Sequence, residues 1–155
     1  MILYLMRHGQ TDWNAEEKVQ GWNDTPLNET GAEQARAAAG KLSGEKIETI
    51  YASDLKRARK SADIISGILD LPVHYTKRLR EMNFGDFEGR SAAELKEDAR
   101  YRAWVDSWCE TRCPHGEGKS DFTRRVVAAF REACESERAQ GSGRAVFVVH
   151  AGTVK

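Results

Sequence analysis

The sequence begins with a short apolar run that ends at a cation, a histidine and a glycine. Residues 2–6 read Ile-Leu-Tyr-Leu-Met and carry no charge. An uncharged run of this length predicts a β-strand buried on both faces, as in a parallel sheet. Arg7, His8 and Gly9 follow directly, at the end of the strand where open α/β sheets place their ligands. On these residue types alone, an exposed basic turn at a strand end is equally expected.

The rest of the chain alternates strand-like apolar runs with helical patterns. Further strands are predicted at 47–52, 71–75 and 145–149, and helices at 29–43, 54–69, 91–109 and 120–139. Polar segments at 10–28 and 79–89 are predicted to be loops. Because strands that alternate with helices form parallel sheets, the predicted fold class is α/β, a three-layer α/β/α sandwich with a mostly parallel central sheet. We expect one domain over 1–155, with a helical cap segment at about 81–120.

Composition excludes several classes of partner. The 24 basic and 24 acidic side chains of the 155 residues cancel, so we expect neither nucleic acid nor an anionic membrane surface as a partner. No apolar run approaches the roughly 20 residues that span a bilayer. The sequence shows no secretory signal pattern and an odd number of cysteines, 3. Reduced thiols and a cytoplasmic location are therefore expected.

The last predicted strand ends as the first one does. Its apolar run stops at His150, and Gly152 follows two residues later. Because the carboxyl ends of parallel strands share one edge of the sheet, His8 and His150 are expected to face each other there. Arg57 lies just after the second strand, in the first turn of a predicted helix, where a cation opposes the helix dipole unless an anion is bound.

Two histidines and two arginines at one edge predict a phosphate pocket with a nucleophile. The guanidinium groups of Arg7 and Arg57 can clamp a phosphoryl group and neutralise its charge. One histidine can attack phosphorus to form a phosphohistidine. The leaving alkoxide needs a proton, and Glu81, in the loop after the third strand, is the candidate acid.

Several motifs together carry a resemblance to a known family. They are Arg7-His8-Gly9, the segment 20–27 (Gln-Gly-Trp-Asn-Asp-Thr-Pro-Leu), the segment 53–58 (Ser-Asp-Leu-Lys-Arg-Ala), the segment 79–89 (Leu-Arg-Glu-Met-Asn-Phe-Gly-Asp-Phe-Glu-Gly) and the segment 149–153 (Val-His-Ala-Gly-Thr). Their order and spacing resemble the histidine phosphatase superfamily, also called the phosphoglycerate-mutase-like family. Each motif alone is weak, but the set is highly specific.

The resemblance implies a role for each matching residue. His8 would be the phosphorylated nucleophile, and Arg7, Arg57 and His150 would bind the phosphoryl group. Glu81 would be the proton donor and then the base that activates water. The resemblance also places substrate contacts at Asn14, Gln20, Gly21 and Gly152. It implies that the protein needs no metal and no cofactor, and that its binding partner is a small-molecule phosphomonoester substrate.

The loop at 81–89 resembles the small bacterial phosphatase branch, including α-ribazole phosphatase, more than the mutase branch. Three readings stay open: a phosphatase, possible substrates of which include α-ribazole 5′-phosphate, a sugar phosphate and phosphoglycerate; a mutase; and a non-catalytic phosphate-binding protein. The chain ends at Lys155, five residues after His150, whereas the family continues with a further helix and strand. We expect an uncovered sheet edge there, which would invite self-association as a homodimer.

Overall fold

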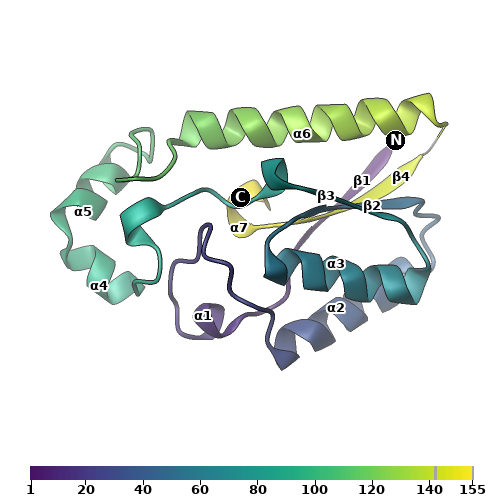
Figure 1. Ribbon diagram of the computed structural model, residues 1–155, viewed down its shortest axis with the longest axis horizontal. Helices are drawn as coiled ribbons and strands as arrows, with labels where there is room; N and C mark the ends of the chain where they lie inside the picture. Colours follow the sequence, from purple (N-terminus) through teal and green to yellow (C-terminus); the bar gives the residue numbers. More distant parts are fainter. Residues whose placement is uncertain (142, 155) are drawn as a thin grey trace.

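A parallel sheet of four strands lies between two helical layers in the computed structural model (Figure 1). The structure describes residues 1–141 and 143–154, so Ser142 and Lys155 of the predicted domain lie outside it. The strands are β1 (Ile2–Arg7), β2 (Thr49–Ser53), β3 (Val73–Thr76) and β4 (Arg144–Val149), in the order β1-β4-β2-β3. All three pairings are parallel, which confirms the predicted α/β class.

The register of the sheet brings the ends of three strands together. Val148 of β4 lies opposite Met6 of β1 on one side and opposite Ala52 of β2 on the other. The residues that directly follow β1, β4 and β2 therefore emerge side by side at one edge. The last strand of the chain has been inserted between the first and the second, and this crossover is what juxtaposes distant parts of the sequence.

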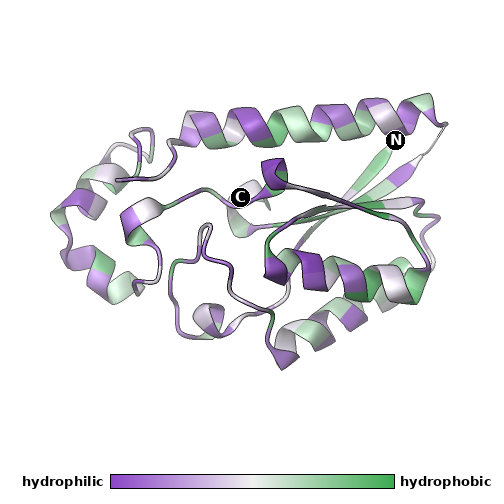
Figure 2. Ribbon diagram, in the orientation of Figure 1, coloured by the Kyte–Doolittle hydropathy of each residue, from purple (hydrophilic) through white to green (hydrophobic). Residues whose placement is uncertain are grey.

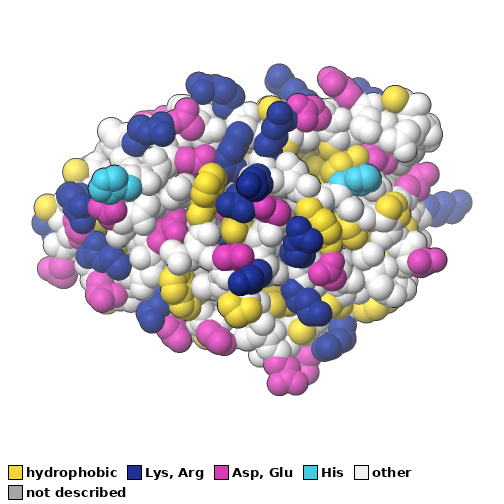
Figure 3. Space-filling model, in the orientation of Figure 1, with side chains coloured by type: hydrophobic (Ala, Val, Ile, Leu, Met, Phe, Trp, Pro, Cys, Tyr) yellow, Lys and Arg dark blue, Asp and Glu magenta, His cyan; other side chains and the backbone are white. Residues whose placement is uncertain are grey.

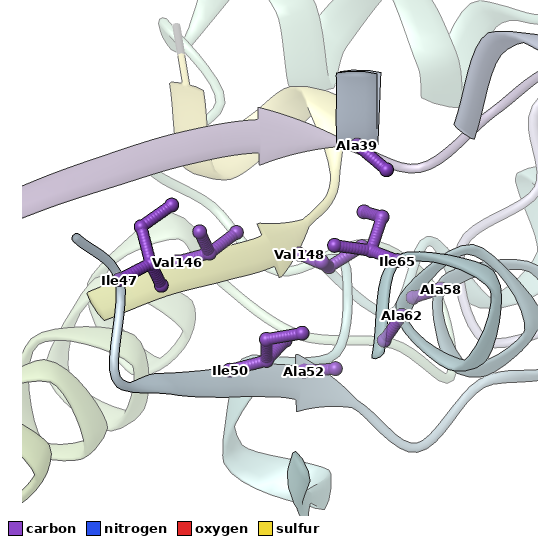
Figure 4. Close-up of a cluster of buried hydrophobic side chains, with 9 residues drawn as sticks. All are labelled: Ala39, Ile47, Ile50, Ala52, Ala58, Ala62, Ile65, Val146 and Val148. Atoms are coloured by element: carbon purple, nitrogen blue, oxygen red, sulfur yellow. The ribbon is translucent and has the colours of Figure 1, made fainter. Parts of the chain in front are cut away.

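One face of the sheet is covered by α2 (Glu29–Leu42) and α3 (Lys56–Leu69). Small alanines on both helices let the backbones approach the sheet closely, and Ile65 of α3 fills the remaining space. The buried cluster is drawn in Figure 4 and consists of Ala39, Ile47, Ile50, Ala52, Ala58, Ala62, Ile65, Val146 and Val148. Asn28, which precedes the acidic Glu29 and is predicted from the sequence to be the N-cap of α2, does cap the helix, because its side chain accepts the Gly31 N–H at 2.9 Å.

The long helix α6 (Lys119–Ala139) covers the opposite face (Figure 1). Ala129 and Ala133 pack against β4, and the Phe130 ring stacks on Phe147 with centroids 4.4 Å apart. Figure 2 shows the apolar residues concentrated on the strands, while the helices alternate apolar and polar positions. This amphipathic pattern is expected for helices that have one face on a sheet.

A helical segment projects beyond the carboxyl ends of the strands (Figure 1). It contains the short 3₁₀ helices η1 (Lys77–Leu79) and η2 (Gly85–Phe87) and the helices α4 (Ala92–Glu97) and α5 (Ala99–Asp106). Buried Leu95 and Trp104 pack with Phe87 from this segment and Phe122 from α6. The segment therefore has an apolar cluster of its own, separate from the two that flank the sheet.

The prediction of one continuous helix at 91–109 is wrong, because the structure has two shorter helices there. Asp98 separates α4 from α5 with an extended backbone, and its side chain caps α5 by accepting the Arg100 N–H at 2.8 Å. The pattern of apolar residues in 91–109 predicts that Trp104 and Trp108 are both buried, but Trp108 is 83% exposed. It lies beyond the end of α5 with a φ of 57°, so the i, i+4 spacing no longer places both rings on one face. Ala99, also expected to be buried, is exposed.

Two further predictions need correction. The segment 10–28 is not wholly irregular, because α1 (Asp12–Ala15) forms within it, capped by a reciprocal pair of hydrogen bonds between Thr11 and Asn14. β1 is not buried on both faces. It is an edge strand, and its Leu3 and Leu5 are 37% and 50% exposed because the cluster under α6 reaches only β2 and β4.

The surface is electrically mixed. On the face shown in Figure 3, lysine and arginine side chains are interspersed with aspartate and glutamate, as expected from the balanced composition. Among the residues that the structure describes, no helix is both long and apolar enough to cross a membrane.

Candidate active site

His8 is fixed at the end of β1 by the sheet itself. Its N–H donates to the Val149 carbonyl at 2.9 Å, which extends the pairing with β4 by one residue. The ring nitrogen Nδ1 lies 2.6 Å from the Gly9 carbonyl oxygen, and Nε2 lies 3.3 Å from the Arg57 Nε. A carbonyl only accepts, so Nδ1 must carry the proton. Nε2 therefore keeps its lone pair and is the nitrogen that can act as a nucleophile.

The surroundings of His8 keep the ring neutral. Burial, together with the positive charges of Arg57 and Arg7, lowers the pKa of His8 to about 3, although the Gly9 carbonyl acts in the opposite direction. The side chain is almost fully enclosed, with 7% exposure. An imidazole with this pKa is unprotonated at neutral pH, which is the state that a nucleophile requires.

Gly9 is required by close packing against α2. A Cβ at this position would lie 2.3 Å from the Gly31 carbonyl oxygen, a distance that real side chains do not reach. The Gly9 N–H also donates to the Ser61 hydroxyl at 3.0 Å. The glycine thus lets the chain turn tightly between two helices directly after the histidine.

Arg57 is a buried cation whose hydrogen-bond partners, in the part of the chain that the structure describes, are all uncharged. Its Nη1 and Nη2 donate to the carbonyl oxygens of Asn23 and Gly21 at 2.8 and 2.7 Å, and Nε faces His8. The side chain is 1% exposed, and burial lowers its pKa to about 10 against the attraction of Glu81. In residues 1–141 and 143–154, Arg57 makes no salt bridge. A buried guanidinium without a carboxylate is a strong attractor for an anion.

His150 follows β4 and completes the pair of histidines. Its ring centroid is 5.1 Å from that of His8, with an angle of 57° between the planes. The side chain is 0% exposed, and neither ring nitrogen has a hydrogen-bond partner among the residues that the structure describes. Burial, followed by the charge of Arg57, lowers its pKa well below the usual range. An unpartnered buried imidazole is costly, and an oxygen of a bound phosphoryl group would remove that cost.

Glu81 links the loop at 79–89 to the segment after His150. Its Oε1 accepts the Met82 N–H at 2.9 Å, and its Oε2 accepts the Gly152 N–H at 3.0 Å. Gly152 lies in α7 (Ala151–Val154), and a Cβ there would be 2.3 Å from Glu81 Oε1. Only glycine leaves room for this carboxylate, which is 7% exposed.

The remaining predicted site residues line the same hollow. Arg7 ends β1 there, and Asn14 lines it while accepting the Thr11 N–H at 3.1 Å. Gln20 is buried, and its side-chain oxygen accepts the Thr11 hydroxyl at 2.9 Å. Gly21 has a φ of 53° and presents its carbonyl to Arg57. The structure thus places all nine predicted residues in or next to one site.

The site opens into a cavity of about 470 Å³. His8, Arg57 and Glu81 line its polar end, and apolar side chains form much of the wall. These are Val19, Met82, Phe84, Phe87, Tyr101, Trp104, Cys109 and Phe122, and the side chains of Lys18 and Lys119 complete the lining. None of these residues was predicted from the sequence to belong to the site. The cluster of aromatics at 84–87 was the available signal, but the wall forms only when 81–118 folds back on α6.

Known proteins resemble this chain along almost its whole length. The model of the histidine phosphatase superfamily (branch 1) matches residues 3–155. Proteins of Escherichia coli strains named "Probable phosphoglycerate mutase GpmB" are 38% identical over 150 residues, which cover 96% of this chain and 68% of theirs.

Solved structures show the same similarity. The α-ribazole phosphatase from Shigella flexneri has a TM-score of 0.86 and 33% identity, and the match covers 99% of this chain and 76% of that one. A mycobacterial glucosyl-3-phosphoglycerate phosphatase, solved in complex with VO3, has a TM-score of 0.87 and 36% identity, and the match covers 98% and 76%.

Proposed function

This chain belongs to the histidine phosphatase superfamily, and from that premise we propose that it is a metal-independent phosphomonoester hydrolase that works through a phosphohistidine at His8. The observation that carries the proposal is the state of His8. Its Nδ1 donates to the Gly9 carbonyl, and its Nε2 points at the buried guanidinium of Arg57. A neutral nucleophile beside an unneutralised cation is suited to attack on a phosphate ester.

In the first step, Nε2 of His8 attacks phosphorus and the ester P–O bond breaks. The N–H groups of Arg57, with the guanidinium of Arg7, hold the non-bridging oxygens as charge develops on them. The N–H of neutral His150 donates to a further oxygen. A protonated Glu81 gives its proton to the leaving oxygen, so the products are an alcohol and phospho-His8.

In the second step, Glu81 acts as a base. The carboxylate that has lost its proton takes one from a water molecule, and the water oxygen attacks phosphorus. The bond between phosphorus and Nε2 breaks, inorganic phosphate leaves, and both His8 and Glu81 return to their starting states. The hydrogen bond from Gly152 holds Glu81 close to the residues that follow β4.

The cavity supports a substrate with an apolar, preferably aromatic, body. Its volume of about 470 Å³ is that of a pocket for a molecule of many atoms. Aromatic walls such as those from Phe84 and Tyr101 favour a stacked ring over a short hydroxy acid. We therefore favour α-ribazole 5′-phosphate, or a phosphomonoester of similar shape, over phosphoglycerate.

A second candidate function is phosphoryl transfer of the phosphoglycerate mutase type. The observation that favours it is the presence of two cations, Lys18 and Lys119, in the lining of the cavity, since a mutase must hold a second phosphate. Each lysine, however, lies within 3.0 Å of a carboxylate, on Glu16 and Glu110 respectively. A mutase would move phosphate between positions of one substrate, and a hydrolase would release it to water.

The proposal is tested by hydrolysis of 4-nitrophenyl phosphate in excess chelator. We expect activity that persists with chelator and disappears in His8→Ala. The matched control is His74→Ala, since His74 is exposed on β3 and stacks on Tyr51, away from the cavity. Activity that chelator abolishes, or that His8→Ala retains, would contradict the mechanism. A folded chain without activity would favour the reading of a phosphate-binding protein.

A further inference from the structure

An ion pair lies directly behind the loop that carries Glu81. Arg125 of α6 donates from Nε and Nη2 to the two carboxylate oxygens of Glu117, each at 2.7 Å. Both side chains are largely buried, with 18% and 15% exposure. Most other ion pairs that the structure describes are more exposed. A paired fork of this geometry is among the stronger polar contacts in proteins.

The side chains of this ion pair form hydrogen bonds with the backbone on both sides of Glu81. The Nη1 of Arg125 donates to the carbonyl oxygens of Arg78 and Arg80 at 2.9 and 2.8 Å, and its Nη2 donates to that of Glu81 at 2.7 Å. Glu117 Oε2 accepts the Asn83 N–H at 2.9 Å. The two side chains therefore hold the main chain at four residues between Arg78 and Asn83, on both sides of Glu81.

No regular element would otherwise hold this stretch. Residues 80–84 lie between η1 and η2 and belong to neither a helix nor a strand. The indole N–H of Trp22 also donates to the Glu81 carbonyl, at 2.8 Å. Within residues 1–141 and 143–154, neither Arg125 nor Glu117 is hydrogen-bonded to the Glu81 carboxylate, which instead accepts from Met82 and Gly152. The contacts of Arg125 and Glu117 with this loop are thus made to its backbone and not to the Glu81 carboxylate.

We propose that Arg125 and Glu117 are positioning residues that hold Glu81 where it can protonate the leaving group. The inference rests on the proposed function, in which Glu81 is the acid. Fixing a flexible loop in advance removes an entropic cost from each turnover, and a shift of about 1 Å can cost a hundredfold in rate. The residues act on the acid step rather than on attack by His8.

The test compares two substrates that differ in their need for an acid. The leaving group of 4-nitrophenyl phosphate is stable as an anion, whereas benzyl phosphate must release an alkoxide. We expect Arg125→Met to lower kcat/KM for benzyl phosphate about tenfold more than for 4-nitrophenyl phosphate. A merely structural role would lower both values by the same factor, and that result would overturn the inference. Arg125→Lys, which keeps the charge, should recover part of the difference.

The neighbouring Arg124 supplies the control. Its side chain is 77% exposed and pairs with Asp121 on the same helix, so Arg124→Met should leave both values unchanged. If Arg125→Met fails to fold, Glu117→Gln is the second variant, and the same difference is expected. Equal losses in that variant would also overturn the inference.

Glu81→Gln tests the acid role of Glu81 separately from the positioning role of Arg125 and Glu117. We expect it to lose benzyl phosphate hydrolysis selectively. If Glu81→Gln shows no such selectivity, the acid role fails and the positioning role fails with it. If Glu81→Gln is selective and the variants of Arg125 and Glu117 are not, only the positioning role fails and the proposed function stands. An inactive wild-type chain would overturn both.

Discussion

The two buried histidines should make the stability of the protein fall as the pH is lowered through the range in which free histidine titrates. His8 and His150 are enclosed and neutral in the folded protein, and the pKa of His8 is lowered from 6.5 to about 3. The unfolded chain therefore binds more protons than the folded one between these values. Their contribution is fully present above pH 6.5 and is lost as the pH falls toward 3.

The size of the change in unfolding free energy follows from the pH range over which the histidine is protonated in the unfolded chain but not in the folded one. At about pH 5 the imidazole of His8 is protonated in the unfolded chain and neutral in the folded one, which costs about 2 kcal/mol relative to neutral pH. His8 should therefore lower the wild-type free energy of unfolding by about 2 kcal/mol between about pH 7 and pH 5, and His150, whose pKa is lowered in the same direction, adds to this loss. The pKa of Asp54 is also lowered, by its hydrogen bonds from Arg80, but this carboxylate contributes below about pH 4, outside the window.

The assay is urea unfolding at the two pH values in phosphate-free buffer, because bound phosphate would stabilise the folded state. His8→Asn keeps an N–H for the Gly9 carbonyl but cannot titrate, so its loss of unfolding free energy should be about 2 kcal/mol smaller than that of the wild type. His74→Ala, on the exposed side of β3, should retain the wild-type loss. A His8→Asn variant with the full wild-type dependence would refute the reasoning, because His8 would then titrate normally in the folded protein.

Other predictions concern the loops that hold the site. Gly152→Ala would place a methyl group 2.3 Å from Glu81 Oε1. Steady-state kinetics should therefore show kcat lowered about ten- to a hundredfold, while the melting temperature changes little. An unchanged kcat would contradict the close packing of Gly152 against Glu81. Glu88 accepts the N–H groups of Trp22 and Phe84 on one oxygen, so Glu88→Gln should cost about 1–3 kcal/mol in urea unfolding, and a cost near zero would argue against this contact. Phe84→Ala should lower kcat/KM for an aromatic phosphomonoester roughly fivefold, which corresponds to about 1 kcal/mol of activation free energy, and should leave kcat/KM for glycerol phosphate unchanged. Equal effects on both substrates would count against an aromatic substrate.

The residues at the ends of the strands were predictable because their placement depends on a general rule. His8 and His150 each follow an apolar run, and Arg57 follows the second strand within one turn. Parallel strands bring such residues to one edge whatever the order of the strands, so the polar end of the site could be inferred without knowing that β4 lies between β1 and β2.

The parts that could not be predicted depend on contacts between distant segments. The exposure of Leu5 follows from the place of β1 at the edge of the sheet, which its uncharged sequence does not reveal. The break at Asp98 depends on a single side chain that caps α5, within a pattern that otherwise reads as one helix. The partner of Glu117 is Arg125, and nothing in the spacing of two charged residues indicates that both hold the backbone around Glu81.

The proposed mechanism requires that His8 becomes covalently phosphorylated during turnover. Trapping this phosphohistidine is the direct test. Glu81→Gln would be mixed with 4-nitrophenyl phosphate, whose leaving group needs no acid, then quenched in base, digested and analysed by mass spectrometry. We expect one added phosphoryl group on the peptide that contains His8, formed in a burst and lost slowly because no base activates water. A burst with the phosphoryl group on another residue, or turnover with no phosphorylated peptide, would contradict the proposed mechanism.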